Sequence, residues 1–209
     1  MYTENDFRTY IKNFSCEKEE VEGCMKLLNN VVSIINDDIS IVLRGVDFNP
    51  KDKKKEKLES ILSEMRTVCF LNNKGFQEIK FISAKKNQKE VDISAKIKEK
   101  EFFIEVKCLT EEYSRPKEHY VDAYLFDDKK FFRTLDTLVC KNLEQLLQYE
   151  KEKRIFTFVF NRAPELQCCN KEYYMLSVKK LYEKYKEDVV HFMFITGYRE
   201  EDFIYPIIS

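Results

Sequence analysis

Glycine is scarce in this chain. The 209 residues include four glycines, and the closest two, Gly23 and Gly45, lie 22 positions apart. A phosphate-binding loop or a dinucleotide-binding fingerprint needs two or three glycines within about eight residues, because only glycine lets the backbone approach a phosphate so closely. The sequence therefore excludes the common nucleotide-binding loops.

Histidine is rarer still, with only His119 and His191 present. They lie 72 positions apart, which excludes the zinc motifs that pair two histidines on one helix. A Ser-His-Asp triad lacks the nucleophile elbow that would support it. We expect His191, inside the apolar run VVHFMFI, to be a core residue.

Long apolar runs and a signal-like start are also absent. No uncharged stretch exceeds about ten residues, whereas ~20 are needed to span a bilayer. The start MYTENDFR lacks the charged-then-apolar order of a signal peptide. The seven cysteines, an odd number, are expected to be reduced thiols. The sequence thus predicts a soluble, cytoplasmic protein without membrane contact.

Neither sign of charge is in excess. The chain carries 36 basic and 37 acidic side chains, which gives a net charge of -1. This balance excludes a protein that coats nucleic acid through overall positive charge. A basic face, offset by acidic residues elsewhere, is compatible with brief contact to nucleic acid. The run Lys51–Lys57 is interpreted as a solvated helix start, with a phosphate-contacting patch as the alternative.

Apolar spacing divides the chain near residue 50. Residues 1–50 are predicted to form a mainly helical extension, in which Ile39–Leu43 is expected to be a short strand. Residues 51–209 are predicted to form an α/β domain. Its first helix should carry one buried stripe from Leu58 onward. That helix should end near Gly75, where glycine accepts the left-handed backbone conformation.

The rest of this domain alternates between strand-like and helix-like segments. We expect strands at Phe76–Ser83, Glu90–Lys98, Glu101–Leu109, Arg154–Phe160 and Val189–Ile195, and helices at Phe131–Lys151 and Lys171–Lys186. The polar segment Thr110–Lys130 fits neither pattern. A hairpin-rich start followed by α/β alternation predicts a mixed central sheet flanked by helices, with the strand Glu101–Leu109 inside it.

The strand predicted at Glu101–Leu109 places charged side chains in an apolar setting. Alternate side chains of a strand face opposite sides, so Glu105 and Lys107 share one side of the sheet. Asp92, on the preceding strand of the predicted hairpin, can approach Glu105. Two adjacent carboxylates repel each other, and a divalent cation relieves this repulsion. The pattern predicts a metal site at which Lys107 holds or deprotonates the water that attacks a phosphodiester.

Asp92, a gap of twelve residues and the tripeptide Glu105-Val-Lys107 resemble the D…(D/E)-x-K signature of the restriction-endonuclease-like, or PD-(D/E)XK, nuclease superfamily. The resemblance covers roughly half of the chain. It implies a restriction-endonuclease-like αβββαβ core with Mg²⁺ or Mn²⁺ as the cofactor. It also implies that Asp92, Glu105 and the carbonyl of Val106 bind the metal, while Lys107 positions and activates the water.

Two further features extend this resemblance. Many members carry a glutamate on the helix before the first strand; Glu64 occupies that place as a metal ligand, and Glu59 is the competing candidate. Gln145 and Tyr149 give a Q-x-x-x-Y spacing similar to the third motif of the RecB and lambda-exonuclease branch. Positions i and i+4 share one helix face, so both side chains are expected at the site with Asp92.

These features predict a nuclease that uses Mg²⁺ or Mn²⁺ to hydrolyse phosphodiester bonds, with DNA expected ahead of RNA. The near-neutral net charge suits an alternative equally well, in which the fold is retained without catalysis. The protein would then be a module that binds nucleic acid or a protein partner. A metal-free α/β enzyme is a third hypothesis, for which the sequence offers no nucleophile. Whether the protein forms a homodimer, and whether it cuts internally or from an end, stay open.

Overall fold

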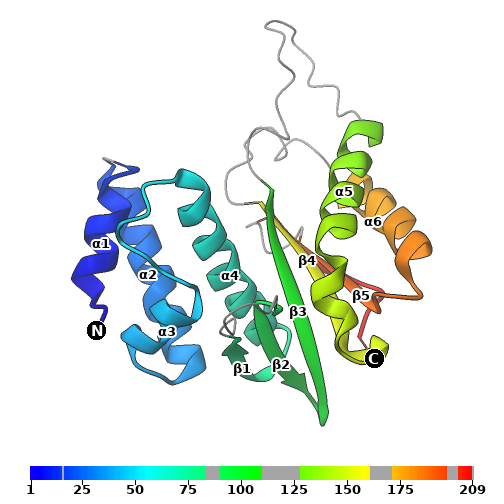
Figure 1. The fold of residues 1–209 in the computed structure, drawn as a ribbon, viewed down its shortest axis with the longest axis horizontal. Helices are drawn as coiled ribbons and strands as arrows, with labels where there is room; N and C mark the ends of the chain where they lie inside the picture. The colour runs from blue at the N-terminus through cyan, green and yellow to red at the C-terminus, as the bar shows by residue number, and fades with distance from the viewer. Residues whose placement is uncertain (16, 83–89, 110–127, 161–170, 197–201, 209) are drawn as a thin grey trace, which may run out of the picture.

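The structure is a computed structural model that describes residues 1–15, 17–82, 90–109, 128–160, 171–196 and 202–208. Figure 1 shows the arrangement of the helices and strands. In chain order they are α1 (Glu4–Lys12), α2 (Lys18–Ile35), α3 (Ile39–Gly45), α4 (Lys55–Asn73), β1 (Gln77–Phe81), β2 (Ile93–Ile97), β3 (Lys100–Leu109), α5 (Asp128–Leu147), the 3₁₀ turn η2 (Lys151–Lys153), β4 (Arg154–Phe160), α6 (Lys171–Tyr185), β5 (His191–Ile195) and β6 (Phe203–Tyr205).

The strands of the described chain form one mixed sheet in the order β1-β2-β3-β4-β5-β6. β1, β2 and β3 pair in antiparallel fashion, whereas β3, β4 and β5 are parallel to one another. β6 is antiparallel to β5 and completes the sheet. The predictions of a mixed central sheet and of an interior position for β3 are therefore confirmed.

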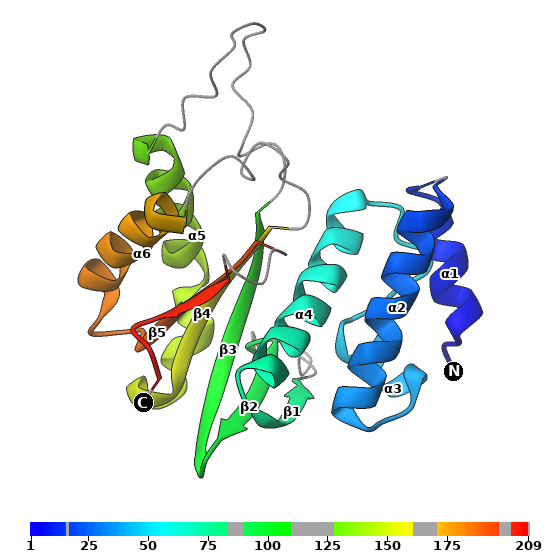
Figure 2. The same cartoon turned by 180° about the vertical axis from the view of Figure 1, so that it is seen from behind.

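Helices cover both faces of this sheet (Figures 1 and 2). On one face, α4 packs against β3 through the buried side chains of Ile104 and Val106. On the other face, α5 and α6 share a core with Phe156 and Phe158 of β4. Successive side chains of a strand alternate between the two faces, which is why β3, β4 and β5 each contribute to both cores.

α4 carries the predicted buried stripe. Ile61, Met65 and Val68 recur at a spacing of three or four residues, and each is fully buried. The helix ends at Asn73, and Gly75 follows with a φ of 86°, the left-handed conformation predicted for it. This turn sends the chain directly from α4 into β1.

The N-terminal helix α2 packs against α4 on the side away from the sheet, and α1 and α3 pack against α2 (Figure 2). Phe7 of α1, Leu28 of α2 and Leu43 of α3 are fully buried, and they belong to the same core as Ile61 of α4 and Ile104 of β3. α4 is therefore covered on both sides, by these helices and by the sheet.

The strand predicted at Ile39–Leu43 is wrong, because these residues begin helix α3. The carbonyl of Asp38 accepts hydrogen bonds from the N–H groups of Ile41 and Val42, at 2.9 and 3.1 Å. Val42 and Val46, four residues apart, are both buried. Burial at helical spacing outweighs the strand preference of β-branched residues. The three-residue strand β6 was not predicted either, since so short a segment carries no periodicity.

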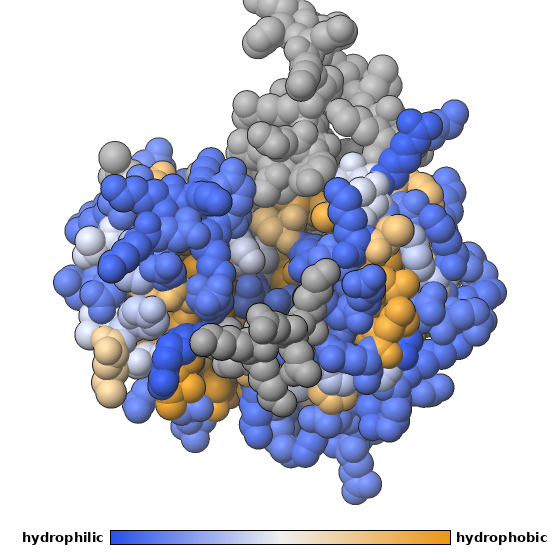
Figure 3. Space-filling model, in the orientation of Figure 1, coloured by the Kyte–Doolittle hydropathy of each residue, from blue (hydrophilic) through white to orange (hydrophobic). Residues whose placement is uncertain are grey.

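Hydrophilic side chains cover most of the face shown in Figure 3, and apolar atoms reach that face in separate patches. The exposed large apolar side chains include Leu147 of α5 and Leu176 of α6. Within the described ranges, no helix is both long enough and apolar enough to cross a membrane.

Arg154, the first residue of β4, connects three backbone segments through its guanidinium group. Nε donates to the carbonyl of Tyr149 at 2.8 Å, and Nη2 donates to the carbonyl of Leu147 at 3.1 Å. Nη1 donates to the carbonyl of Asp188 at 3.0 Å, just before β5. Carbonyls at the end of a helix have no intrahelical donor, so Arg154 supplies the partners that the end of α5 lacks.

We expect Arg154→Lys to lower the free energy of unfolding by about 1–2 kcal/mol, because a lysine ammonium cannot span carbonyls that the planar guanidinium reaches together. Urea denaturation at neutral pH measures the change. The control is Arg133→Lys at an exposed position of α5, which should alter stability by less than about 0.5 kcal/mol. Equal effects of both substitutions would contradict this role of Arg154.

Candidate active site

The candidate site lies where β2 begins and its pairing with β3 ends. Ile93, the first residue of β2, pairs with Ile104 of β3. One residue earlier, the N–H of Asp92 donates to the carbonyl of Ile104 at 3.2 Å. The Asp92 side chain turns back to β3, where Oδ2 accepts a hydrogen bond from the N–H of Val106 at 2.7 Å. The carboxylate thus replaces a backbone partner that β2 no longer supplies.

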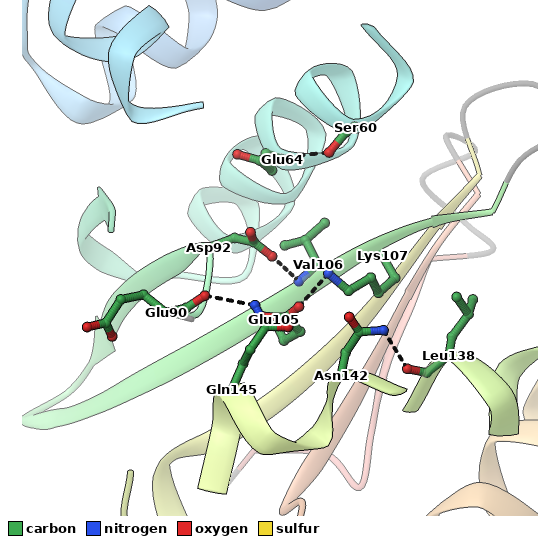
Figure 4. Close-up of polar contacts among 10 residues, drawn as sticks. All are labelled: Ser60, Glu64, Glu90, Asp92, Glu105, Val106, Lys107, Leu138, Asn142 and Gln145. Atoms are coloured by element: carbon green, nitrogen blue, oxygen red, sulfur yellow. Dashed lines mark hydrogen bonds and ion pairs between the residues drawn. The ribbon is translucent and has the colours of Figure 1, made fainter. Parts of the chain in front are cut away.

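Glu105 and Lys107 extend from β3 beside Asp92 (Figure 4). Glu105 is 0% exposed, and Nζ of Lys107 lies 2.5 Å from its Oε1. Oε1 of Glu105 is therefore paired with the Lys107 ammonium, whereas the buried Oε2 has no hydrogen-bond donor among the described residues. A fully buried carboxylate oxygen without a donor is uncommon in proteins and is a feature of sites that take up a cation or water.

Burial and mutual repulsion raise the pKa values of these carboxyl groups. Burial first, and then the charge of Asp92, raise the pKa of Glu105 from 4.5 to about 8. Burial also raises the pKa of Asp92, although the charge of Lys107 and the N–H of Val106 oppose the rise. Burial lowers the pKa of Lys107, but the charges of Glu105 and Asp92 outweigh it, so the pKa is raised. Lys107 is therefore a cation at neutral pH.

Glu64 faces this cluster from α4 (Figure 4). Its side chain is buried, and Oε1 accepts a hydrogen bond from Oγ of Ser60 at 3.3 Å. Burial, and then the charge of Asp92, raise the pKa of Glu64 well above its ordinary value. Glu59 is also buried on α4. The charge of Asp92 acts on Glu64. Of the two candidates, Glu64 therefore better fits the predicted role of a metal ligand on this helix.

The carbonyl of Val106 lies on the same side of β3 as Asp92. In a sheet, the N–H and the C=O of one residue point toward the same neighbouring strand. Because the N–H of Val106 reaches Asp92, its carbonyl also faces the gap beyond the start of β2. This orientation suits the metal-binding role predicted for the Val106 carbonyl.

Gln145 and Tyr149 approach the sheet from the end of α5, but their hydrogen bonds go to Glu90. Nε2 of Gln145 donates to the carbonyl of Glu90 at 3.0 Å, and the hydroxyl of Tyr149 donates to its Oε2 at 2.8 Å. The ring of Tyr149 stacks on Phe103 of β3, with centroids 3.8 Å apart. Burial, and then the bond to Glu90, raise the pKa of Tyr149 and keep its hydroxyl a donor. The two residues thus hold the chain immediately before Asp92.

Two residues near the site carry no signal in the sequence. Glu90 anchors the end of α5, yet no spacing rule marks it. Asn142 of α5 donates from Nδ2 to the carbonyl of Leu138 at 2.8 Å. Figure 4 shows its side chain turned toward the strand that carries Glu105 and Lys107. Sequence reasoning missed both because their positions depend on how α5 docks on the sheet.

The lysine-rich run Lys51–Lys57 leads into α4 beside the site. Nζ of Lys57 pairs with Oδ2 of Asp47 at 3.0 Å. The charge of Lys57 also opposes the rise in pKa that burial causes at Glu64 and Asp92, so positive charge at the start of α4 reaches the site. His119 and most of the unassigned polar segment, residues 110–127, lie outside the described residues.

The capacity of the site for a metal rests on a small ligand set. Among the described residues, no group of three or more His, Cys, Asp or Glu side chains is placed to hold a metal ion. Mg²⁺, however, is commonly bound by one or two carboxylates together with water. Asp92, Glu105 and the carbonyl of Val106 form a set of this kind, and the buried Oε2 of Glu105 has no hydrogen-bond donor in the described chain. The residues present therefore fit Mg²⁺ or Mn²⁺.

Comparisons of this chain with protein-family models, with curated proteins and with solved structures find no match. The geometry of Asp92, Glu105 and Lys107 is accordingly the basis on which a function is assigned.

The raised pKa of Glu105 predicts a pH-dependent loss of stability in the metal-free protein. The folded state holds the Glu105 proton up to about pH 8, whereas the unfolded state releases it near 4.5, so the free energy of unfolding falls as pH rises between these values. Glu105→Gln removes this contribution. Relative to the wild type, the variant should gain about 1 kcal/mol or more between about pH 5 and about pH 8.5.

Urea denaturation in the presence of a chelator measures this gain. Glu101→Gln, a partly exposed position on the same strand, serves as the control and should follow the wild type. A constant difference between Glu105→Gln and the wild type across this pH range would contradict the raised pKa.

Tyr149→Phe should lower the free energy of unfolding by about 0.5–1.5 kcal/mol, because it removes the hydroxyl that donates to Glu90 and keeps the stacked ring. Glu90→Gln tests the same contact from the other side. In a double-mutant cycle the two substitutions should couple by about 0.5 kcal/mol or more. Tyr182→Phe, a partly exposed ring on α6, should have little effect; additive losses from Tyr149→Phe and Glu90→Gln would rule out the contact.

Proposed function

We propose that this protein is a metal-dependent nuclease that hydrolyses DNA phosphodiester bonds. The observation that carries the proposal is the convergence of Asp92, Glu105 and Lys107 at the fork between β2 and β3. The contact between Lys107 and Glu105, the bond from Val106 to Asp92 and the mutual charge effects place the three side chains in one cluster. A fully buried carboxylate beside a half-buried one is costly for stability, and charges held at such a cost are typical of functional sites.

The order of elements supports the same proposal. α4, β1, β2, β3, α5 and β4 follow the αβββαβ order implied by the resemblance to restriction-endonuclease-like nucleases. The cluster lies on the second and third strands of this order, where Asp92 and the Glu105-Val-Lys107 tripeptide were expected. We therefore propose a restriction-endonuclease-like core for residues 51–209.

Asp92, Glu105 and the carbonyl of Val106 would hold Mg²⁺ or Mn²⁺, and Glu64 would bind on the α4 side, directly or through water. A bound divalent cation supplies positive charge to the phosphate and lowers the pKa of a bound water. Such a cation would relieve the repulsion between the ionised carboxylates of Asp92 and Glu105, which the positive charges of Lys107 and Lys57 offset only in part.

Lys107 would hold the attacking water through its N–H groups. Its raised pKa keeps Nζ protonated, so the ammonium orients the water and stabilises developing negative charge instead of removing a proton. Gln145 and Tyr149 would act through Glu90, by fixing the backbone that leads into Asp92. The exposed lysines among residues 51–57 would guide the phosphate backbone toward the site along the start of α4.

Cleavage assays on single- and double-stranded DNA with Mg²⁺ or Mn²⁺ test this proposal. Glu105→Ala and Lys107→Ala should each reduce the rate by about a hundredfold or more, because each removes a group that acts on the transition state. β1 provides a matched control, since Glu78 and Lys80 repeat the same E-x-K spacing at exposed positions. Glu78→Ala and Lys80→Ala should cut at the wild-type rate, and undiminished cleavage by the Glu105 and Lys107 variants would overturn the site.

Thermal unfolding in Mn²⁺ provides a readout that does not depend on activity. A cation that binds only the folded state raises the melting temperature by mass action. The wild type and Glu78→Ala should both respond, whereas Glu105→Gln should not. Mn²⁺ stabilisation without cleavage of any nucleic acid would favour the alternative of a nuclease-fold binding module, and the absence of both would overturn the metal site.

A further inference from the structure

A second cavity, of about 690 Å³, lies at the opposite end of β3 from the candidate active site. The turn between β2 and β3, the first residue of β5 and the C-terminal segment line it. Lys100 opens β3 at this cavity, and Glu105 lies five residues further along the strand. At ~3.3 Å per residue the separation is roughly 16 Å, so the two sites are distinct.

His191 presents a hydrogen-bond acceptor to this cavity. Its Nδ1 lies 2.8 Å from the carbonyl oxygen of Pro206. A carbonyl can only accept, so Nδ1 carries the proton, and the neutral ring has its free lone pair on Nε2. Burial, together with the charge of Lys100, lowers the pKa of His191, although the bond to Pro206 opposes this. The imidazole is therefore neutral and its tautomer is fixed.

Charged side chains of both signs line the mouth of the cavity. Four lysines and two glutamates line it. Lys96 and Lys153 are paired with Glu78 and Glu150, at 2.8 and 3.0 Å.

The other two lysines remain available. Lys98 and Lys100 are exposed at the turn and make no ion pair within the described chain. Nζ of Lys100 lies 5.0 Å from the ring centroid of Phe102, which holds the ammonium against the cavity wall. Ile97 and Ile208 add apolar surface beside these charges.

We propose that this cavity binds a small organic phosphate that also carries an O–H or N–H donor. Lys98 and Lys100 would contact the phosphate, because strongly hydrated ammonium groups without partners suit a compact anion. Nε2 of His191 would accept the hydrogen bond from the donor, and Ile97 and Ile208 would contact the apolar part of the ligand. Nucleoside monophosphates and sugar phosphates share this chemistry. The site is independent of the proposed nuclease centre.

Isothermal titration calorimetry on the full-length protein tests the proposal with AMP and glucose 6-phosphate as probes. At least one of them should bind, and its affinity should exceed that of inorganic phosphate or adenosine by about tenfold or more, since adenosine lacks the phosphate and inorganic phosphate lacks a donor placed apart from its phosphate oxygens. The probe that binds more tightly shows whether the cavity prefers a nucleoside monophosphate or a sugar phosphate. Absence of binding by both probes, or equal affinity for adenosine and AMP, would overturn the proposal.

Paired variants assign the binding to this cavity. Lys98→Ala combined with Lys100→Ala changes two exposed side chains and should weaken binding by about tenfold or more. Lys12→Ala combined with Lys26→Ala removes the same charge from exposed positions on α1 and α2 and should leave the affinity unchanged. Equal losses in both double variants would show unspecific attraction and overturn the site.

His191→Asn tests the acceptor, because the amide Nδ2 can keep the bond to Pro206 while Nε2 is lost. This variant should weaken binding of the organic phosphate and leave the affinity for inorganic phosphate unchanged. Circular dichroism checks its fold. If the variant is unfolded, the affinity of the double variant Lys98→Ala, Lys100→Ala alone tests the site. A DNA oligonucleotide that binds the wild type and loses affinity in the Lys98 and Lys100 variant, while neither small probe binds, would replace the proposed ligand by a nucleic-acid contact and overturn it.

Discussion

The hydrogen bond from the N–H of Val106 to Oδ2 of Asp92 is the constraint on which the candidate active site depends. β3 lies inside the sheet, so each of its N–H groups must find a partner. β2 begins at Ile93 and offers no backbone acceptor for the N–H of Val106. The Asp92 carboxylate fills the gap and is thereby held beside Glu105. Without this bond, repulsion between the two carboxylates would favour their separation.

The surrounding fold holds these charges together from both faces of the sheet. α4 contributes Glu64 on one face, and the end of α5 anchors Glu90 on the other through Gln145 and Tyr149. Lys107 supplies a positive charge within the cluster, but burial still raises the pKa of the carboxyl groups around it. The protein keeps an arrangement that is costly for stability, as functional sites commonly do.

The sequence predicts the parts of this architecture that depend on local pattern. Arg154–Phe160 is a strand with the predicted bounds, because a run of apolar, β-branched and aromatic residues lies between charged segments. The short hairpin likewise predicts that Asp92 approaches Glu105. Contacts made by docking were not predictable: the bond from Tyr149 to Glu90 depends on where α5 meets the sheet. The strand prediction for Ile39–Leu43 was wrong for a related reason, since burial of this segment against other helices outweighs its strand preference.

Because α4 is buried on two sides, the first 50 residues help to position Glu64. α1, α2 and α3 cover one side of α4, and the sheet covers the other. A chain cut at residue 51 would turn an apolar helix surface to water and leave α4 held by the sheet alone. The N-terminal helices thereby support the face of α4 that is turned away from the sheet, and with it the helix that carries Glu64.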